Sequence, residues 1–226
     1  MNAPFEFERA RFNMVEQQIR PWDVLDASVL DLLRLVRRED YVPPDMRELA
    51  FVDTQLPLRV GGMDTGEVML EPKTEARLLQ ELKVGPLDQA LEIGTGSGYM
   101  AALLAHKAQH VTTVEIVAEL AAFAAANLSR NGVHNARVET GDASRGWSAR
   151  APYDVIMVSG SLPVLPEELL AQLKIGGRLA AIVGDAPVMQ GMLVTRRTDD
   201  QFERTVLFET CVPALRNAVH PARFSF

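Results

Sequence analysis

Cysteine and long apolar runs are nearly absent from this 226-residue chain. Its only cysteine is Cys211, so no disulfide can form within the chain, and a reducing compartment fits. Cys211 lies in an apolar stretch, and we expect a buried, unreactive thiol. No apolar run approaches the ~20 residues that span a bilayer, and the acids Glu6 and Glu8 interrupt the amino terminus, so we expect no signal peptide. These absences predict a cytoplasmic protein that does not enter a membrane.

Positive charge is also in deficit. Lysine and arginine number 23 against 30 aspartates and glutamates, which gives a net charge of −7. The pairs Arg37-Arg38 and Arg196-Arg197 are isolated and form no basic patch, so a nucleic acid is not an expected partner. The four histidines show no metal-ligand spacing, and we expect no metal site. Nothing in the sequence fixes the oligomeric state.

Glycine is missing from the first 50 residues, which carry helical patterns instead. Apolar residues follow helical spacing over 12–20 until Pro21 breaks the pattern. Asp26 then suits the amino-terminal cap of a second helix. We expect residues 53–71, which contain three glycines, to be irregular. This region, 1–71, is predicted to be a helical subdomain on the substrate side of the molecule.

From Pro72 to the end, strand and helix patterns alternate, which predicts an α/β core over 72–226. The expected strands are 89–93, 111–115, 136–140, 154–158 and 178–183, and the expected helices are 99–107, 118–130 and 167–173. Such alternation is typical of a mostly parallel sheet covered on both faces. The last two patterns, 191–197 and 202–213, follow each other without a helix and predict an antiparallel hairpin at the sheet edge.

The run Leu91–Tyr99 is the most informative stretch. It reads as a buried strand that ends near Glu92, then a loop with glycine at 94, 96 and 98, then a helix. Such a loop at the carboxyl end of a strand is where open α/β sheets bind nucleotide-like ligands. A dinucleotide fold requires G-x-G-x-x-G, whereas this chain has G-x-G-x-G. The spacing disfavours a nicotinamide dehydrogenase and is typical of methyltransferases that use S-adenosylmethionine (SAM).

Two further acids follow at the ends of the next strands. Glu115 comes 21 positions after Gly94, close to the distance expected for a carboxylate that binds ribose hydroxyls. Asp142 follows the third strand and is suited to accept the adenine amino group. The expected cofactor-binding set is Glu92, Gly94, Thr95, Gly96, Ser97, Gly98, Glu115 and Asp142.

Taken together, the chain resembles the protein-L-isoaspartate O-methyltransferase family from about residue 10 to about 213. The resemblance rests on Leu91–Tyr99, on the stretch Gly141-Asp142 to Gly146-Trp147, and on Val36–Pro43 upstream. It implies a Rossmann-like, SAM-dependent methyltransferase fold, SAM as cofactor, and a protein or peptide as substrate. It also implies methylation of a carboxylate, which needs no general base, so no catalytic residue is expected from the chemistry.

One segment departs from the family pattern. Before the first core helix, family members carry a segment close to G-Q-T-I-S-Q-P, whose hydroxyls help to seat the isoaspartyl group. Here the segment is Gly66–Pro72, with Val68 in place of threonine and Leu70 in place of serine. The alternatives therefore include a SAM-dependent methyltransferase with another acceptor and a non-catalytic SAM-binding protein. Ser159, after the fourth strand, is a remaining hydroxyl near the expected site.

Overall fold

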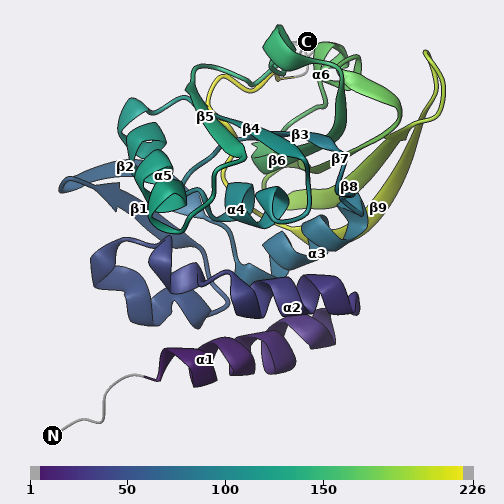
Figure 1. Cartoon of the computed structure of the whole chain (residues 1–226). Helices are drawn as coiled ribbons and strands as arrows, with labels where there is room; N and C mark the ends of the chain where they lie inside the picture. The colour runs from purple at the N-terminus through teal and green to yellow at the C-terminus, as the bar shows by residue number, and fades with distance from the viewer. Residues whose placement is uncertain (1–5, 221–226) are drawn as a thin grey trace, which may run out of the picture.

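The computed structural model describes residues 6–220. Two helices, α1 (Phe7–Met14) and α2 (Ala27–Leu35), form a layer beneath the rest of the molecule in Figure 1. A π-helical turn and a 3-10 turn extend α1 to Trp22, where Pro21 ends the helical region. Short 3-10 segments at Arg38–Asp40 and Pro44–Phe51 follow α2. The expected amino-terminal helices are present.

The expectation that residues 53–71 are irregular is wrong. This region contains an antiparallel hairpin of β1 (Leu56–Val60) and β2 (Met63–Met69). Gly61 and Gly62 form its tip with φ angles of +59° and +82°, which other residues rarely adopt. The glycines therefore mark one tight turn between two strands and not a flexible segment.

The core is a seven-stranded sheet with the order β5-β4-β3-β6-β7-β8-β9. Its strands are β3 (Gln89–Ile93), β4 (His110–Glu115), β5 (Ala136–Thr140), β6 (Tyr153–Leu162), β7 (Leu173–Asp185), β8 (Val188–Arg196) and β9 (Phe202–Thr210). The first five run parallel to one another, and β8 and β9 are antiparallel additions at one edge. The expected parallel sheet with its antiparallel carboxyl-terminal hairpin is confirmed.

Helices cover both faces of this sheet. Successive residues of a strand point to opposite faces, so neighbouring residues of one strand join different buried clusters. Val155 and Met157 of β6 join one buried cluster with α3 (Pro72–Leu82), α4 (Tyr99–Ala105) and α5 (Ala118–Arg130). Their neighbours in β6 join a second cluster with α6 (Glu167–Leu170). The first cluster also contains residues of the amino-terminal helices, so that region packs directly on the core. The subdomain boundary between residues 71 and 72 stays a prediction.

The sequence prediction for Cys211 is wrong, because its side chain is exposed. It follows the last residue of β9, where burial still alternates along the chain, and Val212 takes the inward position. Among residues 6–220, no helix is long and apolar enough to cross a membrane.

The start of α2 provides a test of local stability. The Asp26 carboxylate accepts hydrogen bonds from the backbone N–H groups of Ser28 and Val29, at 2.8 and 3.4 Å. Replacing Asp26 with Ala should lower the free energy of unfolding by about 0.5–2 kcal/mol, because two helix N–H groups lose their acceptor. Urea denaturation measures this change. The control is Asp31→Ala in the same helix, which removes only an exposed pair with Arg34 and should change little.

Candidate functional site

A cleft lies at the carboxyl ends of β3, β4 and β6. The strand order reverses between β3 and β6, and such a switch point is where open α/β sheets bind ligands. Gly94 follows β3 and Ser159 lies in β6, and both line the cleft. Glu67 and Val68 of the β1–β2 hairpin form the opposite wall. The cleft therefore lies between the hairpin and the sheet.

The glycine loop forms the floor of this cleft. Gly94, Gly96 and Gly98 have φ angles of +88°, +52° and +86°, so each position requires the conformational freedom of glycine. Gly94 and Gly96 line the cleft. Gly98 does not line the cleft. A Cβ there would lie 3.3 Å from Ala124 of α5, so Gly98 allows two helices to pack closely.

Glu115, at the end of β4, lies at the predicted place. Its carboxylate accepts hydrogen bonds from the N–H groups of Gly96 and Val117, at 2.8 and 3.0 Å. The side chain lines the cleft although the residue is 4% exposed. Burial raises the pKa of Glu115 above its ordinary value, and the backbone hydrogen bonds offset this only in part. The same carboxylate thus holds the glycine loop and faces the ligand space.

Asp142, after β5, also lines the cleft. It accepts hydrogen bonds from the N–H of Ser144 and from the side chain of Asn217, both at 2.9 Å. Partial burial acts to raise the pKa of Asp142, but these hydrogen bonds outweigh it, and the pKa lies below its ordinary value. Asp142 is therefore an ionised acceptor at neutral pH.

Glu92 is fully buried and lies deeper than the other two acids. Its carboxylate accepts hydrogen bonds from the hydroxyls of Thr113 and Ser159, at 2.7 and 2.8 Å. Burial raises the pKa of Glu92 to about 8, although the two hydroxyl donors act in the opposite direction. Ser159, the remaining hydroxyl of the predicted site, is thus already bonded to Glu92.

Thr95 and Ser97 of the glycine loop line a smaller cavity that continues inward from the cleft, which we call the inner cavity. They also hold the loop in place. The Thr95 hydroxyl lies 2.6 Å from that of Thr113, which connects the loop to β4. The Ser97 carbonyl accepts a hydrogen bond of 2.9 Å from Asn127 of α5. Both side chains are buried, so their first role is to support the loop.

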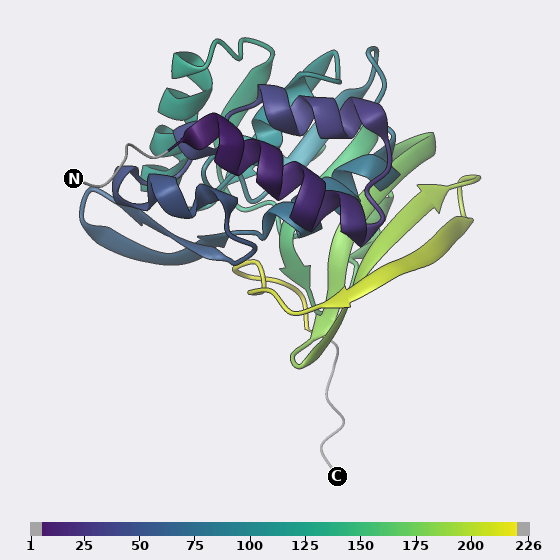
Figure 2. The same ribbon diagram turned by 90° about the horizontal axis from the view of Figure 1, so that it is seen from below.

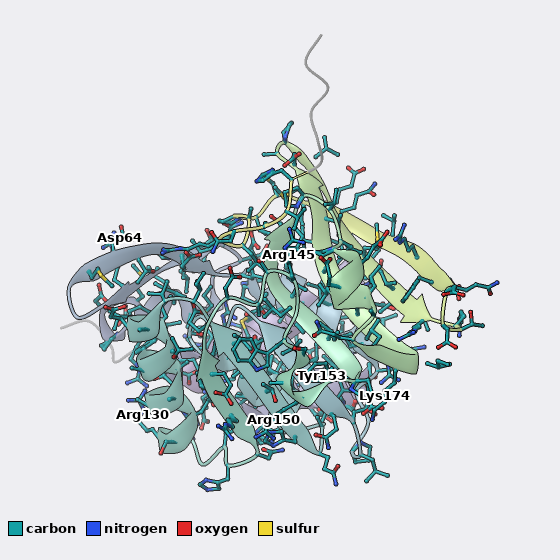
Figure 3. All side chains as sticks on the ribbon, turned by 90° about the horizontal axis from the view of Figure 1, so that it is seen from above. Asp64, Arg130, Arg145, Arg150, Tyr153 and Lys174 are labelled. Carbon is teal, nitrogen blue, oxygen red and sulfur yellow. The ribbon has the colours of Figure 1, made fainter. Side chains whose placement is uncertain are left out.

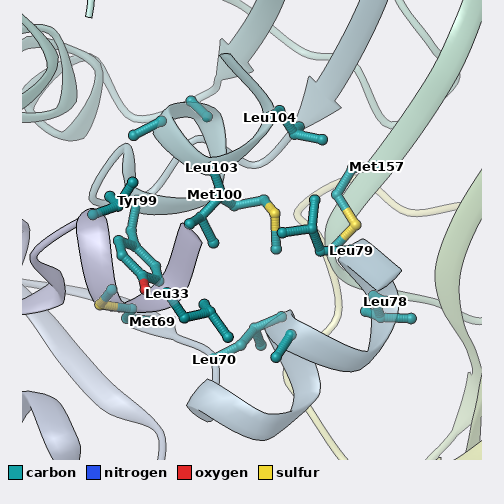
Figure 4. Close-up of a cluster of buried hydrophobic side chains, with 14 of the residues drawn as sticks. Leu33, Met69, Leu70, Leu78, Leu79, Tyr99, Met100, Leu103, Leu104 and Met157 are labelled. Carbon is teal, nitrogen blue, oxygen red and sulfur yellow. The ribbon is translucent and has the colours of Figure 1, made fainter. Parts of the chain in front are cut away.

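The inner cavity shares Val68, Gly94, Gly96 and Ser159 with the cleft. Its other walls include Leu70, Glu75, Glu92 and Met100. The Leu70 side chain is 3% exposed and belongs to the buried cluster that includes Leu79 and Met100, which are labelled in Figure 4. Val68 and Leu70 therefore both border the ligand space. Their role in acceptor binding stays a prediction.

Sequence patterns did not reveal the segment after β9, which borders the cleft. Leu215 lies over the glycine loop, and its Cδ2 would come within 3.3 Å of a Cβ at Gly94. Arg216 pairs with Glu67 of the hairpin at 2.6 Å, and Asn217 bonds to Asp142. Figure 2 shows this yellow segment returning from β9 toward the hairpin. No local motif marks it, because its contacts are to residues far away in sequence.

Basic residues elsewhere on the surface are dispersed. Arg130, Arg145, Arg150 and Lys174, labelled in Figure 3, come from separate parts of the chain. Arg145 pairs with Glu168 and Lys174 pairs with Asp154, each at 2.7 Å. Within the described part of the chain, no cluster of histidine, cysteine, aspartate and glutamate could hold a metal ion. The absence of a nucleic-acid partner stays a prediction.

The sheet, glycine loop and acids define an α/β protein with a nucleoside-type ligand site at its switch point. A family model described as Protein-L-isoaspartate(D-aspartate) O-methyltransferase matches residues 10–217. A protein-L-isoaspartate O-methyltransferase of Rhodopseudomonas palustris is 43% identical over 192 residues, covering 84% of this chain and 86% of the relative. One of Koribacter versatilis is 38% identical over 222 residues, covering 97% and 96%. The chain belongs to the protein-L-isoaspartate O-methyltransferase family, so the resemblance seen in the sequence is confirmed.

Solved structures share the fold. A protein-L-isoaspartate O-methyltransferase superposes with a TM-score of 0.77 at 22% identity, covering 95% of this chain and 67% of its own. A Plasmodium falciparum protein described as the same enzyme, in complex with S-adenosyl-L-homocysteine, gives 0.77 at 20% identity, covering 94% and 99%. The Rossmann-like methyltransferase fold is therefore confirmed, and SAM is the cofactor of this family.

The buried carboxyl of Glu92 predicts a pH dependence of stability. Its pKa of about 8 in the folded protein lies above the ordinary value of 4.5. Between these values the folded state retains a proton that the unfolded state releases, so stability falls as pH rises from 5 to 8. In Glu92→Gln this fall should be smaller by at least about 1 kcal/mol. Urea denaturation at several pH values, without ligand, measures it; parallel curves for both proteins would contradict the assignment.

Proposed function

We propose that this chain is a SAM-dependent carboxyl O-methyltransferase that acts on isoaspartyl groups of proteins in the cytoplasm. The observation that carries the proposal is the convergence of Glu92, Glu115 and Asp142 on one glycine loop. These acids end or follow strands β3, β4 and β5, which lie side by side. Family membership supports the same conclusion, because relatives over most of the chain bear this enzyme name.

The residues of the main cleft fit the adenosine part of SAM. Glu115 faces the cleft with a carboxylate suited to the ribose hydroxyls, beside the backbone of Gly94 and Gly96. Asp142 can accept a hydrogen bond from the adenine amino group, because a carboxylate oxygen accepts more than one donor. Ile116 and Ala143 add apolar surface between these acids. Both polar ends of an adenosine therefore have acceptors.

Methyl transfer makes few demands on protein side chains. When bound, SAM supplies a methyl group on a sulfonium sulfur, and a carboxylate oxygen takes it to give a methyl ester and S-adenosylhomocysteine. The acceptor is already ionised, so the protein moves no proton and contributes orientation and electrostatics. The side chains of Val68 and Leu70 cannot donate hydrogen bonds to that carboxylate. Glu71 nearby accepts hydrogen bonds from Gln55 and Thr74 and adds negative charge on the same segment.

Cofactor binding tests the role of Glu115. Glu115→Ala should weaken S-adenosylhomocysteine binding by about 1.5–3 kcal/mol, because it removes hydrogen bonds to a charged acceptor. Calorimetric titration measures the dissociation constant, with NAD as the comparison ligand. Glu119→Ala is the control, since this exposed glutamate lies in the first turn of α5 and does not line the cleft. Tight NAD binding without S-adenosylhomocysteine binding would refute the proposed cofactor, and an unchanged constant in Glu115→Ala would refute the ribose contact.

Isoaspartyl methylation tests the acceptor segment. We expect weak transfer from radiolabelled SAM to an isoaspartyl peptide, because two hydroxyl donors of the family pattern are missing. One preorganised donor can contribute about 2.7–4 kcal/mol to such a reaction. Val68→Thr with Leu70→Ser should therefore raise the rate at least tenfold, and further when Glu71→Gln is added.

The controls for this experiment separate chemistry from folding. Leu70 is buried, so Val68→Thr alone is measured as well, and S-adenosylhomocysteine binding verifies that each variant is folded. Val206→Thr makes the same exchange on the exposed face of β9 and should leave the rate unchanged. Rapid methylation by the native protein that is insensitive to residues 68 and 70 would place the acceptor contacts elsewhere.

A further inference from the structure

The two edges of the central sheet differ in regularity. β5 forms one edge and pairs only with β4, and β9 forms the other edge (Figure 1). The pairing of β8 with β9 shifts register between Gly191 and Met192, and a bulge of this kind protects an edge strand from further pairing. The pairing of β4 with β5 has no such shift, and β5 contains neither proline nor lysine. β5 is therefore a regular and unprotected edge strand.

Every second residue of β5 directs its backbone away from β4. Asn135, just before β5, and Gly141, just after it, both form backbone hydrogen bonds of 2.9 Å with β4. Because the bonding direction alternates along a strand, Ala136, Val138 and Thr140 direct their N–H and C=O groups outward. Among residues 6–220, no hydrogen-bond partner reaches these outward groups. Such an edge is a template for another strand.

A surface groove beside β5 leaves this edge accessible. On the side of α5 the groove is lined by Leu128 and by the exposed residues Ala125 and Ser129. Ala136 and Val138 line it on the side of β5. The side chains at 125 and 129 are small, so α5 leaves room for a further strand next to β5.

The sequence of β5 is complementary to itself. Arg137 and Glu139 flank Val138, lie on the same face of the sheet and form an ion pair of 2.6 Å within the strand. When two copies of β5 pair antiparallel about a two-fold axis at Val138, Arg137 of each copy lies opposite Glu139 of the other. Ala136 then lies opposite Thr140. Opposite charges directly across such a pair stabilise it, and like charges destabilise it.

We propose that β5 is an interface at which two copies of this chain associate as a symmetric dimer, with their β5 strands antiparallel. In this register the outward N–H and C=O groups of Val138 face those of the second copy, and each gains a hydrogen-bond partner. The two sheets become one continuous sheet, and the contact closes on itself. An unrelated strand would need an acid opposite Arg137 and a base opposite Glu139, whereas a second copy supplies both by symmetry.

Sedimentation of the full chain at concentrations across the micromolar range tests this interface. Each strand contributes only five residues, so we expect a small interface and a dissociation constant in that range. The mass of the native protein should rise from 24.9 kDa toward twice this value as concentration increases. Arg137→Glu places acids opposite each other in both symmetry-related pairs and should raise the dissociation constant by about tenfold or more. Glu139→Arg should do the same by opposing two bases.

Two rescue experiments separate strand pairing from effects on folding. The double variant Arg137→Glu with Glu139→Arg exchanges the charges and restores complementarity, so it should dimerise like the native protein. The two single variants, mixed in equal amounts, should form a mixed dimer, because each supplies the charges that the other requires. Arg204→Glu is the matched control, since it reverses an exposed charge on the other edge strand, β9, and should leave the dissociation constant unchanged.

Urea unfolding verifies that each variant is folded. A native protein that remains a monomer across the concentration range overturns the inference. A dimer that Arg137→Glu leaves intact also overturns it, because the contact then lies on another face. Failure of both the double variant and the mixture to restore the dimer would show that Arg137 and Glu139 do not pair across a two-fold axis, and this too overturns the inference.

Discussion

A single buried guanidinium, that of Arg38, connects the parts of the molecule that surround the site. It donates to the carbonyls of Ala50 and Leu70, at 3.0 and 2.6 Å, and pairs with Glu75. The Cζ atom of Arg38 lies 5.0 Å from the centre of the Tyr99 ring on α4. A guanidinium donates in a fixed planar pattern, so these partners can satisfy it in one arrangement only. The amino-terminal region, the end of the hairpin, α3 and α4 are thereby held in register.

This arrangement separates the backbone of the segment before α3 from the side chains that it carries. Arg38 fixes the backbone of Leu70 through its carbonyl, independent of the side chain at that position. The segment can therefore exchange hydroxyl side chains for apolar ones without moving its backbone. The Leu70 side chain instead packs into the buried cluster, where it contributes to the core. The backbone and the side chain of Leu70 thus serve two different contacts, one with Arg38 and one with the core.

The sheet could be predicted closely from sequence, because its strands are short apolar runs separated by helical patterns. Residues 89–93 and 136–140 were expected as strands and are β3 and β5. The β1–β2 hairpin was missed because Pro57 and Gly66 interrupt any regular alternation, so that the segment read as irregular. Glu115 and Asp142 were found because strand ends are recognisable locally. Glu75 and Asn217 were not, since each reaches the site only through tertiary packing.

The segment after β9 bonds to residues that are far away in the sequence. The side chain of Gln55 bonds to the carbonyl of Cys211 at 3.0 Å, 156 positions away, and Arg216 reaches Glu67 across 149 positions. Contacts of such long range form late in folding, because the loop between them must close first. The pairing of β3 with β6 joins residues only 65 positions apart, so it closes a much shorter loop and precedes these contacts. The cleft therefore acquires its full border only in the last stage of folding.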